Sequence, residues 1–170
     1  NGSDKEHKTA YAAYLGLCSF MDAMVGKVVD TLTDVGGLGR TRIIYTSDHG
    51  ENAGARGQWG KSNHYEEASG IPMILAGAGV PVGKVSLTPV SLVDVHPSII
   101  NWMSAEDPDA SELPGRCLFD IAVADDDPNR VVFSEYHAAK SPSGSFMIRK
   151  GRYKYIHYVV GGILHIDWSH

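Results

Sequence analysis

Apolar residues recur at helical spacing along the first part of the chain. From about residue 9 to residue 32 they return every three or four positions, which defines one stripe along a helix. The stripe consists of Tyr11, Tyr14, Leu15, Cys18, Met21, Val25, Val28, Val29 and Leu32. Glycines at positions 36, 37 and 39 favour the end of the helix. We therefore expect a long helix over residues 9–32 with its stripe buried.

Two short apolar runs follow, and their β-branched and aromatic content predicts buried strands at residues 41–47 and 71–76. The 23 polar residues between them, 48–70, form a loop of a length that is usually functional in compact domains. The pattern at residues 91–103 predicts another helix. Helix, strand, loop, strand and helix in this order indicate an α/β fold with a mostly parallel sheet and flanking helices.

The last third of the chain changes character. Residues 104–128 are acidic and predict a loop. Alternating runs at 131–137, 145–149 and 152–158, separated by turn residues, predict three antiparallel strands. The sequence thus predicts an α/β portion over residues 1–128 and a small antiparallel β subdomain over residues 129–170.

Composition narrows the function classes. The chain has 170 residues, 15 basic and 20 acidic, with a net charge of −5, and this acidity argues against a nucleic-acid binder. The two cysteines, Cys18 and Cys117, are too few for a disulfide framework. No uninterrupted apolar run approaches the roughly 20 residues of a membrane span, so none is expected. The chain begins at Asn1 without an initiator methionine, and we expect it to be part of a longer protein.

The densest chemistry follows the first predicted strand. Asp48 and His49 stand at the carboxyl end of that strand, where ligand crevices form in α/β sheets. A carboxylate and an imidazole together suit a divalent ion such as Mn²⁺ or Zn²⁺, whereas Ca²⁺ prefers oxygen ligands. The alternative is a turn closed by a local hydrogen bond.

Lys61 lies in the same long loop, thirteen residues after Asp48. An ammonium group beside a metal ion suits a tetrahedral oxyanion, because the two cations share its negative charge. Arg56 and His64 are further candidates by proximity in the sequence. The alternatives are a solvated surface lysine for Lys61 and an exposed loop residue for His64.

In combination and order, these motifs resemble the C-terminal half of a sulfatase of the alkaline-phosphatase superfamily. The segments that carry the resemblance are the helix around Asp22, residues 47–51, 59–62, 65–67 and 70–74, the helix that contains residues 88–98, and the strand pair at 146–155. The likeness extends over roughly residues 11–159. It implies an alkaline-phosphatase-like sheet and the hydrolysis of sulfate esters.

The resemblance assigns roles to individual residues. Asp48 and His49 match the family's second pair of metal ligands, and the family implies one divalent ion, Ca²⁺ above all. Lys61 matches the lysine that contacts sulfate or phosphonate oxygens. His137 lies where the C-terminal subdomain approaches the pocket in this family, which implies a substrate contact; the alternative is a histidine on a strand face. Many sulfatases have asparagine in place of His49, and the Asp–His form also resembles phosphonate monoester hydrolases.

The departures from the family bear on function. Its nucleophile is a formylglycine made within a Cys-x-Pro-x-Arg sequence, and neither Cys18 nor Cys117 stands in that context. The family's first aspartate pair also has no equivalent here. We therefore expect the C-terminal part of a metal-dependent sulfuric ester hydrolase, inactive without its N-terminal half, with a small-molecule sulfate ester as its substrate. The alternatives are a phosphonate monoester or phosphodiester hydrolase, or a non-catalytic remnant. The compartment stays open between the periplasm and the cytoplasm of a bacterium.

Overall fold

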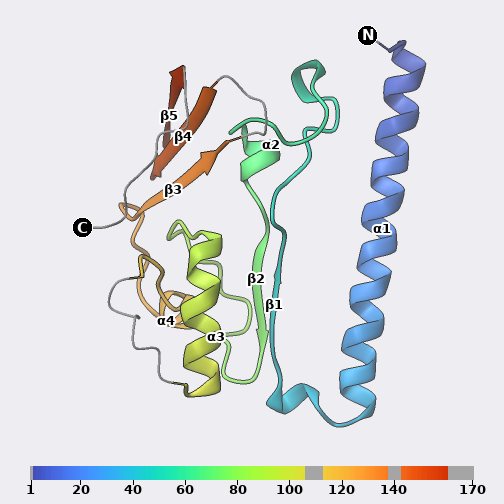
Figure 1. Ribbon diagram of the computed structural model, residues 1–170. Helices are drawn as coiled ribbons and strands as arrows, with labels where there is room; N and C mark the ends of the chain where they lie inside the picture. The colour runs from blue at the N-terminus through green and yellow to red at the C-terminus, as the bar shows by residue number, and fades with distance from the viewer. Residues whose placement is uncertain (1, 106–112, 138–142, 161–170) are drawn as a thin grey trace. The chain divides into compact units, whose positions relative to one another are not determined.

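The computed structural model describes residues 2–105, 113–137 and 143–160 (Figure 1). The chain divides into two units, residues 1–83 and 84–170. The predicted boundary lies after residue 128 and separates a catalytic domain from a C-terminal subdomain. The two units are instead defined by contacts between residues, so the domain boundary stays a prediction. Each unit is described by itself below.

Helix α1 (Asp4–Asp34) opens the first unit. Ser3 caps it, because the Ser3 hydroxyl accepts from the Glu6 amide at 3.4 Å and the Glu6 carboxylate accepts from the Ser3 amide at 2.6 Å. This capping box starts the helix five residues earlier than the apolar spacing predicts. The predicted helix is therefore confirmed and extended.

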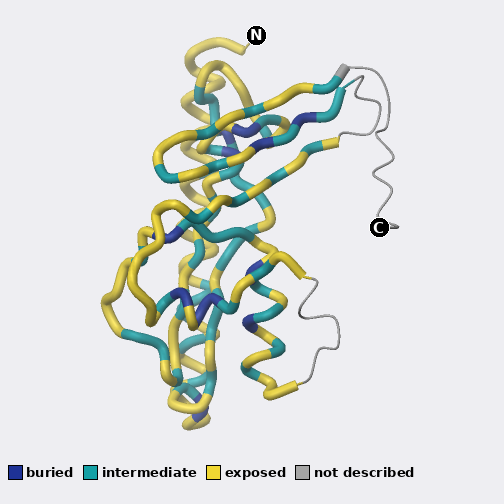
Figure 2. Tube along the Cα trace, turned by 90° about the vertical axis from the view of Figure 1, so that its left-hand side faces the viewer, coloured by how far each residue is buried: buried dark blue, intermediate teal, exposed yellow. Residues whose placement is uncertain are grey.

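The predicted burial of the α1 stripe is wrong for the described residues. No residue of α1 is buried, and only some positions, such as Tyr14, Val25 and Val29, are half-buried (Figure 2). The reason is geometric. A helix of 31 residues is about 46 Å long, whereas the five-residue strands of this unit span only about 17 Å.

Helix α1 is also the one described helix that is long and apolar enough to cross a membrane, judged by length and composition alone. An 18-residue window has a mean hydropathy of 1.4. This corrects the expectation that no segment qualifies, because Asp22 interrupts the apolar run without shortening the helix. An aspartate is costly inside a membrane span, and Asp22 thus favours a helix that packs against protein.

Strands β1 (Arg42–Thr46) and β2 (Met73–Gly77) confirm the two predicted strands. They pair antiparallel, with Ile44 opposite Leu75. The expected parallel arrangement does not hold for this pair. Parallel neighbours need a crossover that returns the chain to the starting end, whereas residues 47–72 contain only the 3₁₀ turn η2 (Ala55–Gly57) and helix α2 (Glu66–Ser69) and re-enter at the end where β1 stops.

The second unit begins with a helical segment built around a buried aspartate. The predicted helix over residues 91–103 is confirmed as the 3₁₀ turn η3 (Leu92–Asp94) followed by α3 (Val95–Met103). Asp94 has no exposed surface, and its carboxylate receives both terminal nitrogens of Arg130 at 2.6 and 2.8 Å. The amides of Ser91 and Arg116 donate to the same carboxylate, each at 2.8 Å. One buried carboxylate thus joins three segments of this unit.

The expected loop over residues 104–128 contains a helix. Helix α4 (Leu118–Val123) buries Leu118, Phe119 and Ile121. The amide of Leu118 donates to the buried Ser98 hydroxyl at 2.7 Å, which ties α4 to α3. Six residues are too few to show a helical period in the sequence, so packing rather than pattern determines this helix.

Three antiparallel strands complete the second unit, as predicted. They are β3 (Val131–Tyr136), β4 (Ser143–Lys150) and β5 (Tyr153–Val160), with β4 in the middle. In the register Phe133 lies opposite Ile148, and Ile148 lies opposite Tyr155. The predicted turn at Lys150 and Gly151 joins β4 to β5. Of the turn predicted at 141–144, residues 141 and 142 lie outside the described residues, and Ser143 and Gly144 belong to β4 instead.

Candidate functional site

Asp48 and His49 lie directly after β1, where the chain leaves the sheet. The His49 amide donates to Asp48 Oδ1 at 3.0 Å, and the ring Nδ1 contacts the Gly50 carbonyl oxygen at 2.8 Å. Because a carbonyl oxygen only accepts, Nδ1 carries the proton. The other ring nitrogen, Nε2, lies 3.4 Å from Asp48 Oδ2. Local hydrogen bonds therefore set the imidazole so that Nε2 lies beside a carboxylate oxygen of Asp48.

This arrangement fits two ligands of one divalent cation. The Gly50 carbonyl fixes the tautomer in which Nε2 carries the lone pair, as a backbone carbonyl commonly does behind a metal-bound histidine. Two ligands at tetrahedral Zn²⁺ stand about 3.3 Å apart for bonds of about 2.0 Å, and two neighbouring oxygens around Ca²⁺ stand about 3.4 Å apart for bonds of about 2.4 Å. The observed 3.4 Å agrees with both. No cluster of three or more His, Cys, Asp or Glu occurs in the described ranges, so further ligands would come from elsewhere.

Gly50 allows the loop to approach α2 closely. Its amide donates to the Ala68 carbonyl at 2.8 Å, and a Cβ at this position would collide with the Glu67 carbonyl oxygen. Glycine is thus required by contact with a backbone. The contact docks the end of the Asp48–His49 segment on α2.

Glu51 and Asn52 bind the far side of the same loop. Glu51 Oε1 accepts from the amides of Ala53, at 3.1 Å, and of Gly60, at 2.5 Å. The Asn52 amide donates to the Gly60 carbonyl at 2.9 Å, and its side-chain Nδ2 donates to the same oxygen. Gly60 adopts φ of +80°, which suits glycine. Sequence reasoning missed these two residues because their partners are backbone groups.

The backbone amides of Ala53 and Gly60 lower the pKa of Glu51, because both donate to its ionised carboxylate. Folding therefore favours the charged form. The ionised Glu51 carboxylate stabilises the fold fully at pH values above the pKa that glutamate has in the unfolded chain, about 4.3. This stabilisation is lost as the pH falls through the lowered pKa of Glu51 in the folded protein. We expect the stability difference between wild type and Glu51→Gln to shrink between pH 7 and pH 3.

Urea midpoints measured across that range test this expectation. Glu51→Gln keeps a carbonyl oxygen as acceptor but has no charge to titrate. Asp30→Asn, on the exposed surface of α1, is the matched control for loss of a carboxylate. A wild-type to Glu51→Gln difference that stays constant down to pH 3 would contradict the assignment.

The Lys61 side chain is exposed and forms no hydrogen bond or ion pair with any residue in the described part of the chain. Its backbone is held on both sides. On one side Gly60, the preceding residue, is hydrogen-bonded to Glu51 and Asn52. On the other side the Asn63 amide donates to the Lys61 carbonyl at 2.7 Å. The ammonium group is thus available to an anion, at the end of a backbone that is fixed.

Arg56 and His64, the two further candidates for substrate contact, both have a defined place in this loop. The Arg56 guanidinium donates to Glu67 at 2.8 Å and stacks 4.2 Å above the Tyr65 ring, at a residue with φ of +54°. The contact with Glu67 raises the pKa of Arg56. His64 is only 3 % exposed, so it is not an exposed loop residue. The Arg56 side chain thus ties the loop to α2, and the His64 side chain is buried beneath it; their predicted substrate contacts stay predictions.

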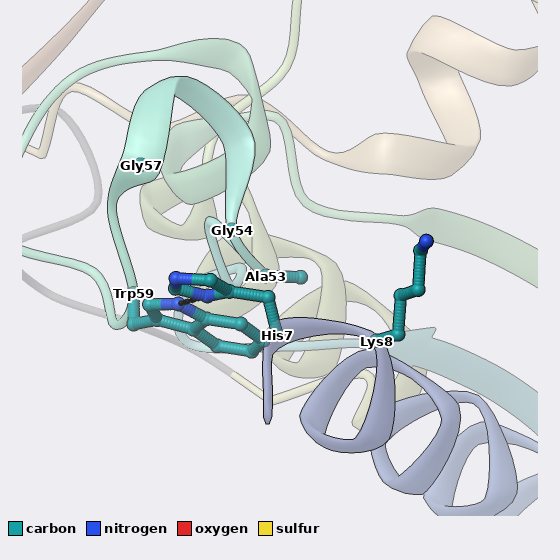
Figure 3. Close-up of a pocket in the computed structure, with 6 residues that line it drawn as sticks. All are labelled: His7, Lys8, Ala53, Gly54, Gly57 and Trp59. Atoms are coloured by element: carbon teal, nitrogen blue, oxygen red, sulfur yellow. Dashed lines mark hydrogen bonds between the residues drawn. The ribbon is translucent and has the colours of Figure 1, made fainter. Parts of the chain in front are cut away.

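A small hollow lies beside this loop (Figure 3). Its volume is about 270 Å³, and it is lined by His7, Lys8, Ala53, Gly54, Gly57 and Trp59. Trp59 Nε1 donates to His7 Nδ1 at 3.2 Å, and the two rings are stacked with an interplanar angle of 9°. The start of α1 is thereby joined to the segment that precedes Lys61.

His137 lies in the second unit, directly after β3. Its Nε2 lies 3.6 Å from a Glu135 oxygen, and its ring meets Phe146 edge-on with centroids 5.2 Å apart. A Cβ on Gly144 would collide with the ring. These contacts describe a histidine packed on the face of the β3–β4 pair, and its contact with substrate stays a prediction.

Comparison with known proteins places this site in a family. The sulfatase family model matches residues 1–105, which include β1, β2 and the whole loop between them. The chain belongs to the sulfatase family. The match confirms the sulfatase family that the motifs indicate, and sulfatases typically bind a divalent metal ion.

Similar sulfatases are found among animal proteins. The chain is 32% identical over 164 residues to arylsulfatase K of Danio rerio, which covers 94% of this chain and 31% of that protein. It is 31% identical over 165 residues to arylsulfatase K of Homo sapiens, with 92% of this chain and 30% of that protein covered. The chain therefore spans about a third of the length of these relatives.

Solved structures share the fold. A phosphonate monoester hydrolase from Silicibacter pomeroyi superposes with a TM-score of 0.83 at 27% identity, covering 94% of this chain and 35% of that one. A protein solved in complex with D-glucosamine-2-N,6-O-disulfate superposes with a TM-score of 0.72 at 26% identity, covering 80% of this chain and 29% of that one. The chain thus corresponds to part of a sulfatase-type fold.

Proposed function

We propose that these 170 residues are the C-terminal portion of a sulfuric ester hydrolase and supply half of its catalytic site. The observation that carries the proposal is the Asp48–His49 pair, whose Oδ2 and Nε2 face one another at 3.4 Å at the end of β1. Membership of the sulfatase family supports it, as does Lys61 in the same loop, whose ammonium group has no partner among the described residues. Residues 1–128 would then belong to the catalytic α/β domain and residues 129–170 to the C-terminal subdomain.

Asp48 and His49 would hold one divalent metal ion, which when bound would polarise a sulfate oxygen. We favour Ca²⁺ from the family likeness, with Mn²⁺ or Zn²⁺ suited to the imidazole ligand. Lys61 would place its ammonium against the sulfate oxygens, where negative charge grows as the ester bond breaks. The nucleophile would come from outside these residues, which makes the isolated chain an incomplete catalyst.

Lys61→Ala tests the role of the lysine in the full-length enzyme. We expect the variant to keep its metal and to hydrolyse 4-nitrophenyl sulfate about a hundredfold more slowly, because one charge-stabilising donor is lost. Metal content by mass spectrometry and kcat are the measurements. Lys150→Ala, an exposed lysine at the end of β4, is the matched control. A wild-type kcat in the Lys61→Ala enzyme would show that Lys61 does not stabilise the charge on the sulfate oxygens.

A phosphonate monoester hydrolase is the second candidate, favoured by the TM-score of 0.83 with such an enzyme and by the Asp–His form of the metal pair. The two candidates share the same residues. The ratio of kcat/KM for 4-nitrophenyl sulfate to that for 4-nitrophenyl phenylphosphonate separates them: a sulfatase prefers the first ester, and a phosphonate hydrolase prefers the second.

A further inference from the structure

We infer that Glu51 and Asn52 are positioning residues that aim Lys61 at the ester. The inference rests on the proposed role of Lys61. Gly60, the residue before Lys61, has both of its backbone polar groups bound by this pair: its amide donates to Glu51 Oε1, and its carbonyl accepts from the Asn52 amide and side chain. Three hydrogen bonds therefore fix the peptide units on either side of the Gly60 Cα.

The opposite side of Lys61 is also closed. The Asn63 side chain donates to Gln58 Oε1 at 2.7 Å, and the Asn63 amide donates to the Lys61 carbonyl. Residues 58–63 thus form a small loop with Lys61 near its tip. We call it the Lys61 loop.

The pair that holds this loop is anchored more firmly than the loop itself. Asn52 is only 2 % exposed, whereas Gln58, Lys61 and Ser62 are all exposed. Glu51 uses a charged oxygen on two amides, and such charge-assisted bonds are roughly twice as strong as neutral ones. Glu51 and Asn52 follow the Asp48–His49 pair after a single residue, Gly50. The same short segment therefore carries the metal ligands and fixes the base of the Lys61 loop.

This coupling has a consequence for catalysis. A lysine has a flexible four-carbon side chain, so the position of its Cα decides which point its ammonium reaches. A displacement of about 1 Å in a charge-stabilising group costs up to about a hundredfold in rate. Without the bonds to Gly60, Lys61 would keep its charge, but its ammonium group would no longer be held against the ester. The kcat would therefore fall while the metal stays bound.

The test is a double-mutant cycle in the full-length enzyme with 4-nitrophenyl sulfate. Glu51→Ala should lower kcat about tenfold with KM and metal content little changed, and Glu51→Gln, which retains the acceptor oxygen, should restore kcat to within about threefold of wild type. In the Lys61→Ala background Glu51→Ala should lower kcat less than about twofold, because its effect passes through the lysine. Asp30→Ala is the matched control.

The outcomes separate this inference from the proposed function. If Lys61→Ala retains wild-type kcat, the proposed function itself fails at this residue. The positioning role is wrong, and the proposed function stands, in two cases with a slow Lys61→Ala enzyme. In the first, Glu51→Ala leaves kcat unchanged. In the second, the kcat loss of the double variant is the product of the two single losses. Should Glu51→Ala not fold, Gln58→Ala replaces it in the cycle, since it opens the Lys61 loop from its exposed side. If Gln58→Ala lowers kcat by the same factor in the Lys61→Ala background as in the wild type, the inference is also overturned.

Discussion

Asp48→Ala is expected to remove the divalent metal and about a thousandfold of the hydrolysis rate together. The two losses share one cause, because the carboxylate would be a ligand of the ion that polarises the ester. The side chain of Asp48 is 81% exposed and its oxygen faces His49 Nε2. Its removal therefore costs the fold little, and a loss of activity would report on the site.

Bound metal per protein molecule and kcat for 4-nitrophenyl sulfate, measured on the same preparations of full-length enzyme, check this expectation. Asp30→Ala, on the surface of α1, is the matched control. His49→Asn adds a graded case: an amide oxygen replaces the imidazole nitrogen, and part of the metal and of the activity should remain. An Asp48→Ala enzyme that retains its metal would remove Asp48 from the ligand set.

Arg130→Met is expected to destabilise the protein by about 3–5 kcal/mol, the usual cost of leaving a buried charge without its partner. The Asp94 carboxylate has no exposed surface, and the side chain of Arg130 is only 10% exposed. Arg130 also donates to the Pro89 carbonyl at 2.7 Å. The substitution would strand a charge where no water replaces the guanidinium.

The free energy of unfolding from urea titrations tests this second expectation. Asp94→Asn combined with Arg130→Met removes both charges, so the double variant should be less destabilised than the sum of the single variants. Arg152→Met, an exposed arginine whose NH2 donates to the Tyr153 hydroxyl, is the matched control. A loss below about 1 kcal/mol in Arg130→Met, the range of an exposed pair, would contradict the buried ion pair.

The sequence predicts the elements of this chain better than their pairing. Residues 9–32 have a long helical period and residues 131–158 alternate cleanly, and both predictions are confirmed. Residues 41–47 also become a strand, but the partner of a strand depends on the path of the loop that follows. Helix α4 was missed because six residues carry no readable period, and it forms because Leu118 and Phe119 have a place to pack.

The candidate site divides in the same way. Asp48, His49 and Lys61 can be selected from the sequence because a carboxylate, an imidazole and an ammonium group indicate metal binding and the binding of an anion. Glu51 and Asn52 cannot, since they act on the backbone of Gly60, and a backbone group has no signature in the sequence. His64 illustrates the converse error: a histidine in a polar loop resembles an exposed residue until the fold buries it.

Intact mass and peptide mapping of the native gene product test whether Asp48, His49 and Lys61 serve a formylglycine nucleophile. We predict a product well above 18.4 kDa, with a formylglycine in a Cys-x-Pro-x-Arg peptide upstream of Asn1 and with these three residues completing the site. A native product of about 18.4 kDa that carries no such peptide would contradict it, because these residues would then have no nucleophile to serve.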